Sequence, residues 1–306
     1  MLTGIALKIA STLFFSGMLA LVKYYSAYPV AELVFFRSSF ALIPLMFWLL
    51  ARGNFPRALH TKNLGGHLIR SLAGVGSMSL MFAAYSFLPF ADVTAIGYAG
   101  PLLIVVFSAL LLRETVTGSR WAAVMIGFAG VLVMLWEHLG GHADPRASIG
   151  ALCAFFAAVL VSIAMIQTRR LTRTEDTGAI VFYFQTSTTL ASLLLMLAAE
   201  AWPDTAPFAG AIQSQAWVWP TMADWWPLIA LGLLGGIGQI FMTQSYRFAD
   251  ASIIACFDYT SMIWALAIGL LFFHEAPTDI ALVGATIIAS GGLLAIYAER
   301  AAKKPS

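Results

Sequence analysis

Long apolar stretches follow one another along almost the whole chain, and they constrain its fold more than any other feature. A helix that crosses the roughly 30 Å hydrocarbon core of a membrane needs about 20 mostly apolar residues. The sequence contains ten stretches of this kind, at 3–22, 30–50, 67–88, 91–112, 119–137, 147–168, 178–199, 225–246, 251–273 and 279–298. We therefore predict an all-α membrane protein with ten transmembrane helices.

The composition excludes a water-soluble protein. Hydrophobic residues make up 60% of the 306 positions and charged residues only 10%, whereas a soluble domain carries about 25% charged residues. The net charge of +2 gives no sign of a nucleic-acid partner, and we expect none. The first stretch could pass for a signal peptide because Lys8 precedes an apolar run. No small-residue cleavage site follows before Lys23, so we expect a retained helix.

The basic residues of the predicted loops are distributed unevenly. With the N-terminus placed inside, the inner segments carry thirteen Lys and Arg residues, Arg70 among them, and the outer loops carry only Lys23 and Arg146. This bias predicts a multi-pass protein of the cell inner membrane with both termini in the cytoplasm. Lys8 and Arg37 fall within apolar stretches. We expect Lys8 to reach the inner headgroups with its long side chain.

The two halves of the chain resemble each other. A shift of 161 residues aligns MFAAYSF (81–87) with MTQSYRF (242–248), and the alignment runs without a gap to residue 135. Earlier in each half, FFRSS (35–39) aligns with YFQTS (183–187). Each half holds five predicted helices, an odd number, so the second half enters the membrane upside down, as in many secondary transporters. The predicted inverted five-helix repeats are 1–138 and 147–298.

Several features resemble the EamA-type transporters of the drug/metabolite transporter superfamily. These are the five-plus-five helix plan, LLLRE (110–114) after the fourth stretch, LLFFHE (270–275) at the end of the ninth, and Pro101 in the middle of the fourth. The resemblance covers nearly the whole chain. It implies a carrier of small organic metabolites, with helices three, four, eight and nine around a central cavity and helices five and ten at the periphery.

Arg37 and Asp258 are the two ionisable residues expected well inside the membrane. Such groups are costly in hydrocarbon, so each is a functional hypothesis. Arg37 is either a hydrogen-bonding centre for helix-end carbonyls and Ser38 or Ser39, or an anchor for an anionic or carbonyl group of the substrate. Asp258 is either a proton acceptor or a partner for a cationic group of the substrate, or else a static salt bridge or cavity wall.

Further candidates for substrate contact are polar and aromatic side chains in the third, fourth, eighth and ninth helices. Tyrosine and tryptophan offer a ring for stacking and a polar atom that needs a partner. The alternative interpretation is packing between helices. For the group as a whole we favour a cavity that holds a partly aromatic metabolite. These candidates are Tyr85, Tyr98, Gln239, Gln244, Tyr246, Tyr259 and Trp264.

Neither a metal nor a cofactor is expected. EHLGGHAD (137–144) contains ligand types for a metal, but two glycines separate its histidines and it falls in a loop, which favours a solvated segment. The sequence has no HExxH and no GxSxG motif, so we do not expect an enzyme.

The predicted helix ends carry acids and aromatic residues. Glu114 and Glu275 end the fourth and ninth helices, on the unfavourable side of the helix dipole, so neighbouring cations such as His274 should compensate them. We expect these acids to organise loops or gates. The tryptophan-rich segment 200–224 is expected to lie along the outer membrane surface.

The function predicted from the sequence is secondary transport by alternating access. The narrow substrate hypothesis is uptake of a riboflavin-like vitamin, and the alternative is export of aromatic or neutral amino acids or drugs. The expected partners are the substrate, the lipid bilayer and coupled protons, in a monomer or homodimer.

Overall fold

A computed structural model describes residues 2–53, 55–56, 59–112, 118–139, 144–201, 215–248 and 257–275, and a few residues between 279 and 294. Every element in these segments is helical, and none of them contains a strand. In chain order the elements are α1 (Leu2–Tyr24), α2 (Val30–Ala51), α3 (Leu64–Tyr85), α4 (Phe90–Gly97), α5 (Ala99–Leu112), α6 (Gly118–Leu139), α7 (Pro145–Leu171), α8 (Thr177–Ala201), α10 (Trp225–Phe248), η2 (Phe257–Tyr259), α12 (Thr260–Ile268) and η3 (Gly269–Phe273).

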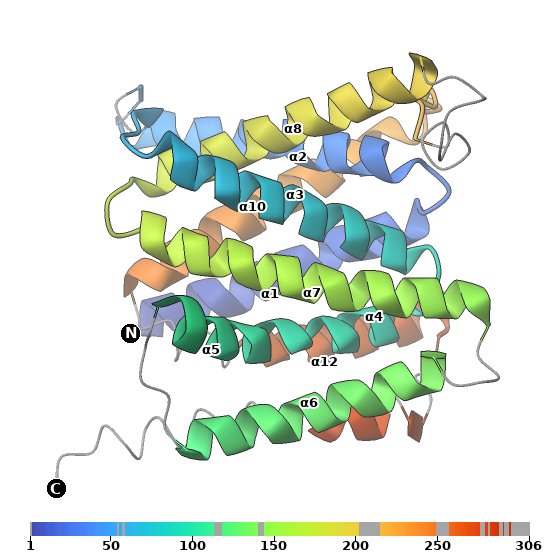
Figure 1. The fold of residues 1–306 in the computed structure, drawn as a ribbon. Helices are drawn as coiled ribbons and strands as arrows, with labels where there is room; N and C mark the ends of the chain where they lie inside the picture. The colour runs from blue at the N-terminus through green and yellow to red at the C-terminus, as the bar shows by residue number, and fades with distance from the viewer. Residues whose placement is uncertain are drawn as a thin grey trace, which may run out of the picture.

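The helices form one bundle with the connecting segments at its two ends (Figure 1). Among the described residues, seven helical segments are long and apolar enough to cross a membrane, namely α1, α2, α3, the run through α4 and α5, α7, α8 and α10. They coincide with seven of the ten predicted stretches, which confirms a multi-pass helical membrane protein. The stretch 119–137 lies within α6, whereas 251–256 and half of 279–298 lie outside the described residues. The count of ten helices and the inverted repeat stay predictions.

Local capping signals set where two of the long helices begin. Asn63 precedes α3, and its side-chain oxygen accepts a hydrogen bond from the Gly66 backbone N–H at 2.9 Å. Asp144 does the same for α7 by accepting from the Arg146 N–H at 3.1 Å. Pro145 follows at the first helical position, where its missing N–H costs no helical hydrogen bond.

The fourth stretch is broken into two helices. α4 ends at Gly97, α5 begins at Ala99, and Tyr98 is the turn residue between them. Pro101 was expected in the middle of one helix, but it lies in the first turn of α5. A proline there needs no N–H donor and leaves the helix intact, so the interruption precedes the proline.

The ninth stretch is also irregular. Its described part consists of a 3₁₀ turn (η2), a short α-helix (α12) and a π-helical segment (η3), which ends at His274 in the left-handed conformation. Non-α turns of this kind aim side chains in directions that a regular helix does not. Two of the predicted spans are therefore interrupted, and α4 and α12 pack against each other.

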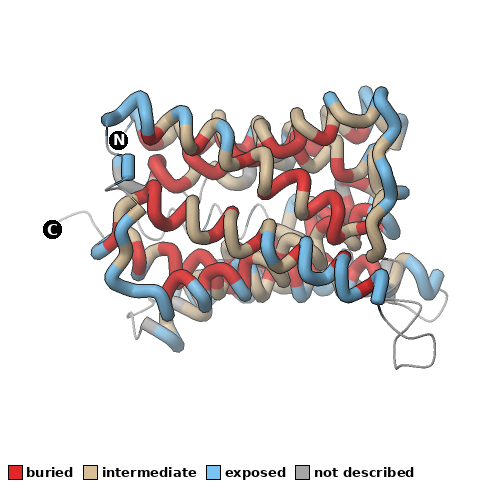
Figure 2. Tube along the Cα trace, turned by 90° about the horizontal axis from the view of Figure 1, so that it is seen from above, coloured by how far each residue is buried: buried red, intermediate tan, exposed pale blue. Residues whose placement is uncertain are grey.

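The rest of the bundle is closely packed. α1 packs against α10, α2 against α8 and α10, and α3 against α7. A Cβ added to Gly236 of α10 would lie 2.8 Å from Ala41 Cα of α2, so glycine brings these two backbones together. Figure 2 shows buried residues on the facing sides of the helices and exposed residues mostly at their ends and outer faces.

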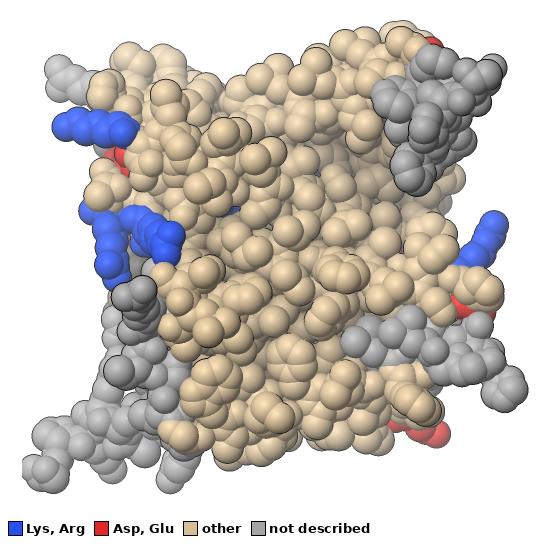
Figure 3. All heavy atoms as spheres, viewed as in Figure 1, with Lys and Arg blue, Asp and Glu red and all other residues tan. Residues whose placement is uncertain are grey.

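On the face shown in Figure 3, charged side chains lie at the two ends of the bundle. Most of the lysine and arginine atoms on this face lie at the end where the N-terminus is found, and a broad uncharged band separates the two ends. An uncharged band between charged ends is the surface that a membrane requires.

Candidate functional site

Lys8 of α1 forms a buried ion pair with Asp258 of η2. The Lys8 Nζ lies 2.6 Å from the Asp258 Oδ1, and the two side chains are 3% and 32% exposed. The expectation that Lys8 reaches the headgroups is therefore wrong. A lysine can reach the interface only when nothing nearer neutralises it, and here an acid about 250 positions later in the chain does so.

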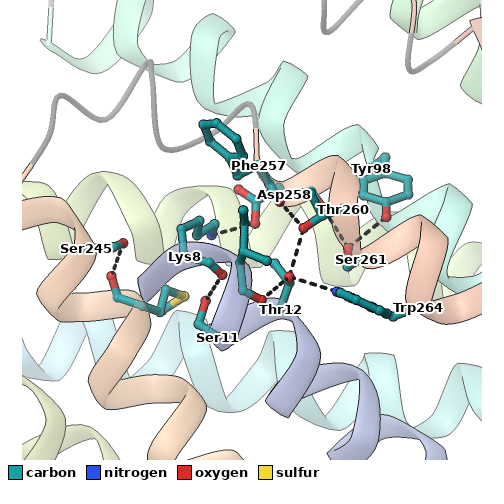
Figure 4. Close-up of polar contacts among 12 residues, drawn as sticks. Lys8, Ser11, Thr12, Tyr98, Ser245, Phe257, Asp258, Thr260, Ser261 and Trp264 are labelled. Carbon is teal, nitrogen blue, oxygen red and sulfur yellow. Dashed lines mark hydrogen bonds and ion pairs between the residues drawn. The ribbon is translucent and has the colours of Figure 1, made fainter. Parts of the chain in front are cut away.

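Hydroxyl and aromatic groups surround this pair (Figure 4). Thr12 Oγ1 lies 2.9 Å from Thr260 Oγ1, and it accepts a hydrogen bond from the Trp264 indole N–H at 3.3 Å. On the other side of α12, the Tyr98 hydroxyl lies 2.7 Å from the Ser261 hydroxyl. The Lys8–Asp258 cluster consists of Lys8, Thr12, Tyr98, Asp258, Thr260, Ser261 and Trp264.

The broken helices place these groups together. Asp258 occupies the 3₁₀ turn just before α12, where the helix N-terminus stabilises a carboxylate. The Ser261 hydroxyl donates to the Asp258 backbone carbonyl at 2.6 Å, which ties the turn to the helix. Tyr98 is the turn residue between α4 and α5. The cluster therefore joins both interruptions in the bundle to α1, a helix that the sequence did not assign to the cavity.

A second buried polar group lies between α2, α3 and α8. Arg37 is 3% exposed, and its Nη1 donates to Gln185 Oε1 at 2.6 Å. Arg70 is 4% exposed, and its guanidinium carbon lies 4.1 Å from the centre of the Phe184 ring. The Arg37 guanidinium faces the same ring at 5.6 Å. We call Arg37, Arg70, Phe184 and Gln185 the arginine cluster.

One expectation about these arginines needs correction. Arg70 was counted among the basic residues of the inner segments, but α3 begins at Leu64 and carries Arg70 into the bundle. Arg37 was expected to be either a hydrogen-bonding centre or a substrate anchor. Its described hydrogen-bond partner is Gln185, while Ser39 donates to the Phe35 carbonyl, and the role as a substrate anchor stays a prediction. The sequence did hold a signal, because the alignment of FFRSS with YFQTS places Arg37 opposite Gln185.

The other predicted residues fall into different surroundings. Tyr85 is buried and stacks on Phe90 with ring centres 5.1 Å apart, and its hydroxyl lies 3.2 Å from the Thr94 hydroxyl. Gln239 and Gln244 of α10 are buried, and the Gln244 side-chain nitrogen has no hydrogen-bond partner among the described residues. The side chains of Tyr246 and Tyr259 lie outside the described part of the chain. Among the predicted residues, the structure thus brings together Tyr98, Asp258 and Trp264.

The end of the bundle opposite the N-terminus is closed by a polar contact that we call the end latch. Lys23 Nζ lies 3.3 Å from Glu275 Oε1 and also donates to the Leu88 carbonyl at 2.7 Å. Glu275 Oε2 accepts from the Phe90 N–H, at the start of α4, at 2.9 Å. A cation compensates Glu275, as predicted. The described cation is Lys23, whereas the sequence suggested His274. Glu114 lies outside the described residues.

The segment after residue 214 also closes over this end. The Val218 N–H donates to the buried Glu32 side chain of α2 at 3.0 Å, and Trp217 packs on Phe35 and Phe36. Trp219 is exposed. The part of the predicted surface segment from 202 to 214 lies outside the described residues.

A hydrogen-bonded pair in the adjoining loops, Tyr28 and Asp224, has shifted pKa values. The Tyr28 hydroxyl donates to Asp224 Oδ2 at 2.7 Å, and the Thr221 hydroxyl donates to the same oxygen at 2.6 Å. Hydrogen bonds from Thr221 and Tyr28 lower the pKa of Asp224. Burial, together with the bond to Asp224, raises the pKa of Tyr28 to about 12.

No group of three or more metal-ligand side chains occurs among the described residues. Most of the segment 137–144, including the side chains of both histidines, lies outside them, so its predicted state is untested.

Comparison with known proteins places this architecture among transporters. The sequence profile of the EamA-like transporter family matches residues 2–136 and 148–297. The pseudopaline exporter CntI of Pseudomonas aeruginosa strain UCBPP-PA14 is 30% identical over 94% of this chain and 93% of its own. A riboflavin transporter of Rhizobium johnstonii is 28% identical over 92% and 85%.

An uptake transporter and a solved structure are also similar to this chain. An S-adenosylmethionine uptake transporter of Rickettsia prowazekii is 24% identical over 88% of this chain and 83% of its own. A solved crystal structure superposes with a TM-score of 0.71 over 99% of both chains at 22% identity, which shows a shared fold.

Proposed function

Because the chain belongs to the EamA-like transporter family, we propose that it is a secondary transporter that carries a small organic metabolite across the cell inner membrane. Its cycle is alternating access, with both termini in the cytoplasm. The uneven distribution of basic residues supports this orientation. The relatives include an exporter, an uptake transporter and a riboflavin transporter, so their names do not set a direction for this chain.

The observation that carries the proposal is the Lys8–Asp258 pair. Lys8 is almost fully buried, so it needs a negative partner at every stage of the cycle, whereas Asp258 keeps an accessible face. When a proton or a cationic group neutralises the Asp258 carboxylate, Lys8 becomes free to bind another carboxylate. The pair can therefore bind the two charged ends of a zwitterion, or Asp258 can accept a proton.

This arrangement favours a zwitterionic amino acid or a related metabolite as substrate. Its carboxylate would face Lys8, its ammonium group would face Asp258, and Tyr98 and Trp264 would supply aromatic surface for an aromatic side chain. We propose export of such compounds as the first candidate. Uptake of a riboflavin-like vitamin is the second, supported by the riboflavin transporter that is 28% identical to this chain.

Counterflow in proteoliposomes tests the proposal. Vesicles loaded with an unlabelled aromatic amino acid, riboflavin or S-adenosylmethionine should accumulate the same compound in labelled form, because a carrier exchanges its substrate. We expect accumulation with the amino acid, a loss of at least about tenfold in Asp258→Asn, and full activity in the control Glu200→Gln, which removes an exposed acid at the end of α8.

The outcomes separate the alternatives. Accumulation of riboflavin alone replaces the first candidate with the second. Equal activity of Asp258→Asn and wild type with any transported compound contradicts a role for the pair. Proton coupling predicts that an imposed pH gradient drives net movement in wild type and fails to do so in Asp258→Asn.

A further inference from the structure

Two arginines lie in the middle of the bundle, and no described acid neutralises them. Arg37 comes from α2 and Arg70 from α3, both almost completely buried, and both guanidinium groups face the ring of Phe184 in α8. Among the described residues, neither arginine forms an ion pair with a carboxylate. The cluster therefore gathers two positive charges where one would already need a counter-charge.

The polar atoms left over in this cluster are all donors. Gln185 Oε1 accepts from Arg37 Nη1, which directs the amide nitrogen of Gln185 away from that bond. The Arg37 Nε, the Arg70 Nε and the Gln185 Nε2 are buried and have no hydrogen-bond partner in the part of the chain that the structure describes. Unpaired buried donors are costly, and three of them in one cluster favour the binding of an acceptor.

The acid that faces α3 does not supply this acceptor. Glu175 has one oxygen 3.1 Å from the Lys62 N–H and the other 3.8 Å from His67 Nε2 of α3, and among the described residues it forms no ion pair with either arginine. The face of Phe184 attracts a desolvated cation, but this attraction is weaker than the cost of burying each charge. An anion from outside the chain is the remaining source of compensation.

We propose that the arginine cluster is a binding site for a small anion, either a free halide or the carboxylate of an organic solute. A guanidinium fork matches a carboxylate with two parallel hydrogen bonds, and a halide accepts from the same N–H groups. The site differs from the Lys8–Asp258 cluster, since it is built from α2, α3 and α8. It does not depend on which solute the protein transports.

Glycine leaves room for the cluster on two helices. A Cβ added to Gly74 of α3 would lie 2.5 Å from Arg70 Nη1 and 2.5 Å from Phe184 Cε2. A Cβ added to Gly235 of α10 would lie 3.1 Å from Arg37 Nε. The guanidinium groups thus lie directly against helix backbones, an arrangement that larger residues at these positions would disturb.

The test measures thermal unfolding of the purified protein in detergent while chloride or acetate replaces a bulky sulfonate at constant ionic strength. We expect one or both anions to raise the melting temperature of wild type by about 2–4 °C at saturating concentration. Arg70→Gln should lose this rise. The control Arg52→Gln removes an exposed arginine that also faces a ring, that of Trp48 at 4.4 Å, and should keep it.

Gln185→Glu provides an independent variant that places a carboxylate inside the cluster. The tethered acid should take the place of the anion, so the melting temperature should be at least as high as wild type and should no longer respond to added anion. A response to chloride identifies a free-anion site, and a response to acetate alone identifies a site for the carboxylate of a solute. No response in wild type, or an equal response in Arg70→Gln, overturns the proposal, whatever the counterflow experiments show.

Discussion

The Lys8–Asp258 cluster and the arginine cluster bury charge in opposite ways. In the first, a buried lysine meets an acid at 2.6 Å, and hydroxyl groups bond to one another around the pair. In the second, two arginines face one aromatic ring, Arg37 alone bonds the Gln185 amide, and three donors have no acceptor among the described residues. A charge with its partner in the chain is a stable element that a proton or substrate must displace. A buried charge without a partner is costly unless another group neutralises it.

The largest effect on stability is expected when the Lys8–Asp258 ion pair is broken. Asp258→Asn leaves Lys8 buried without a counter-charge and should destabilise the protein by about 2–4 kcal/mol. Lys8→Gln leaves a carboxylate that is partly accessible, so its cost should be smaller. Thermal unfolding in detergent should show Asp258→Asn as the less stable variant, with the double variant less affected than the two single costs combined. The reverse order of the single variants would contradict the assigned burial.

Removing an uncompensated charge should have the opposite sign. In the absence of small anions, Arg70→Gln takes away one of two unpaired buried cations, so stability should stay within about 1 kcal/mol of wild type or rise. Unfolding curves measured with only the bulky sulfonate present check this directly. A loss comparable to that of Asp258→Asn would mean that Arg70 is paired in the protein, and the contrast between the clusters would disappear.

The end latch tests whether compensation matters less when the pair is more exposed. Lys23 and Glu275 form an ion pair at the end of the bundle, with more access to solvent than Lys8 has. Lys23→Met should therefore cost only about 1 kcal/mol. Glu275→Ala should cost more than Glu275→Gln, because the glutamine oxygen can still accept from the Phe90 N–H. Equal losses in the two Glu275 variants would argue against that hydrogen bond.

The smallest effect is expected where a neutral donor meets an acid in the loops. Because the folded pKa of Asp224 is lowered from 3.8, its contribution is present above that value and is lost as the pH falls through the folded pKa. Because the folded pKa of Tyr28 is raised from 10.0 to about 12, its contribution is present below 10.0 and is lost as the pH rises through 12.

Tyr28→Phe should thus lower the melting temperature slightly between these limits, by an amount that does not change with pH. The measurement compares the melting temperatures of the variant and wild type across this range, and the difference should shrink in acid. A difference that grows as the pH falls below the ordinary Asp pKa would show that the bond to Asp224 is not its source.

Much of the fold could be predicted because its signals are local. Length and apolarity alone identify the seven membrane-spanning segments, and Asn63 and Asp144 mark helix starts within a few residues of the predicted ones. The break at Tyr98 was not predicted. Pro101 can be read directly from the sequence, whereas the turn before it depends on packing against α12.

The site was only partly predictable. The rule that buried charges are functional found Arg37 and Asp258, but it assigned Lys8 to the headgroups and Arg70 to a loop. Both errors come from judging a charge by its distance from a helix end. The alignment of the two halves placed Gln185 opposite Arg37, yet only the structure shows that the two side chains touch.

The sequence by itself determined that this is a multi-pass helical transporter of the EamA-like family, because apolar length and family motifs are properties of contiguous segments. The tertiary structure alone decided which charges are compensated. Lys8 and Asp258 are about 250 residues apart, and Arg37 and Arg70 approach one ring from different helices. The free energy of a buried charge depends on the few ångströms around it, and the chain sets those distances only by folding.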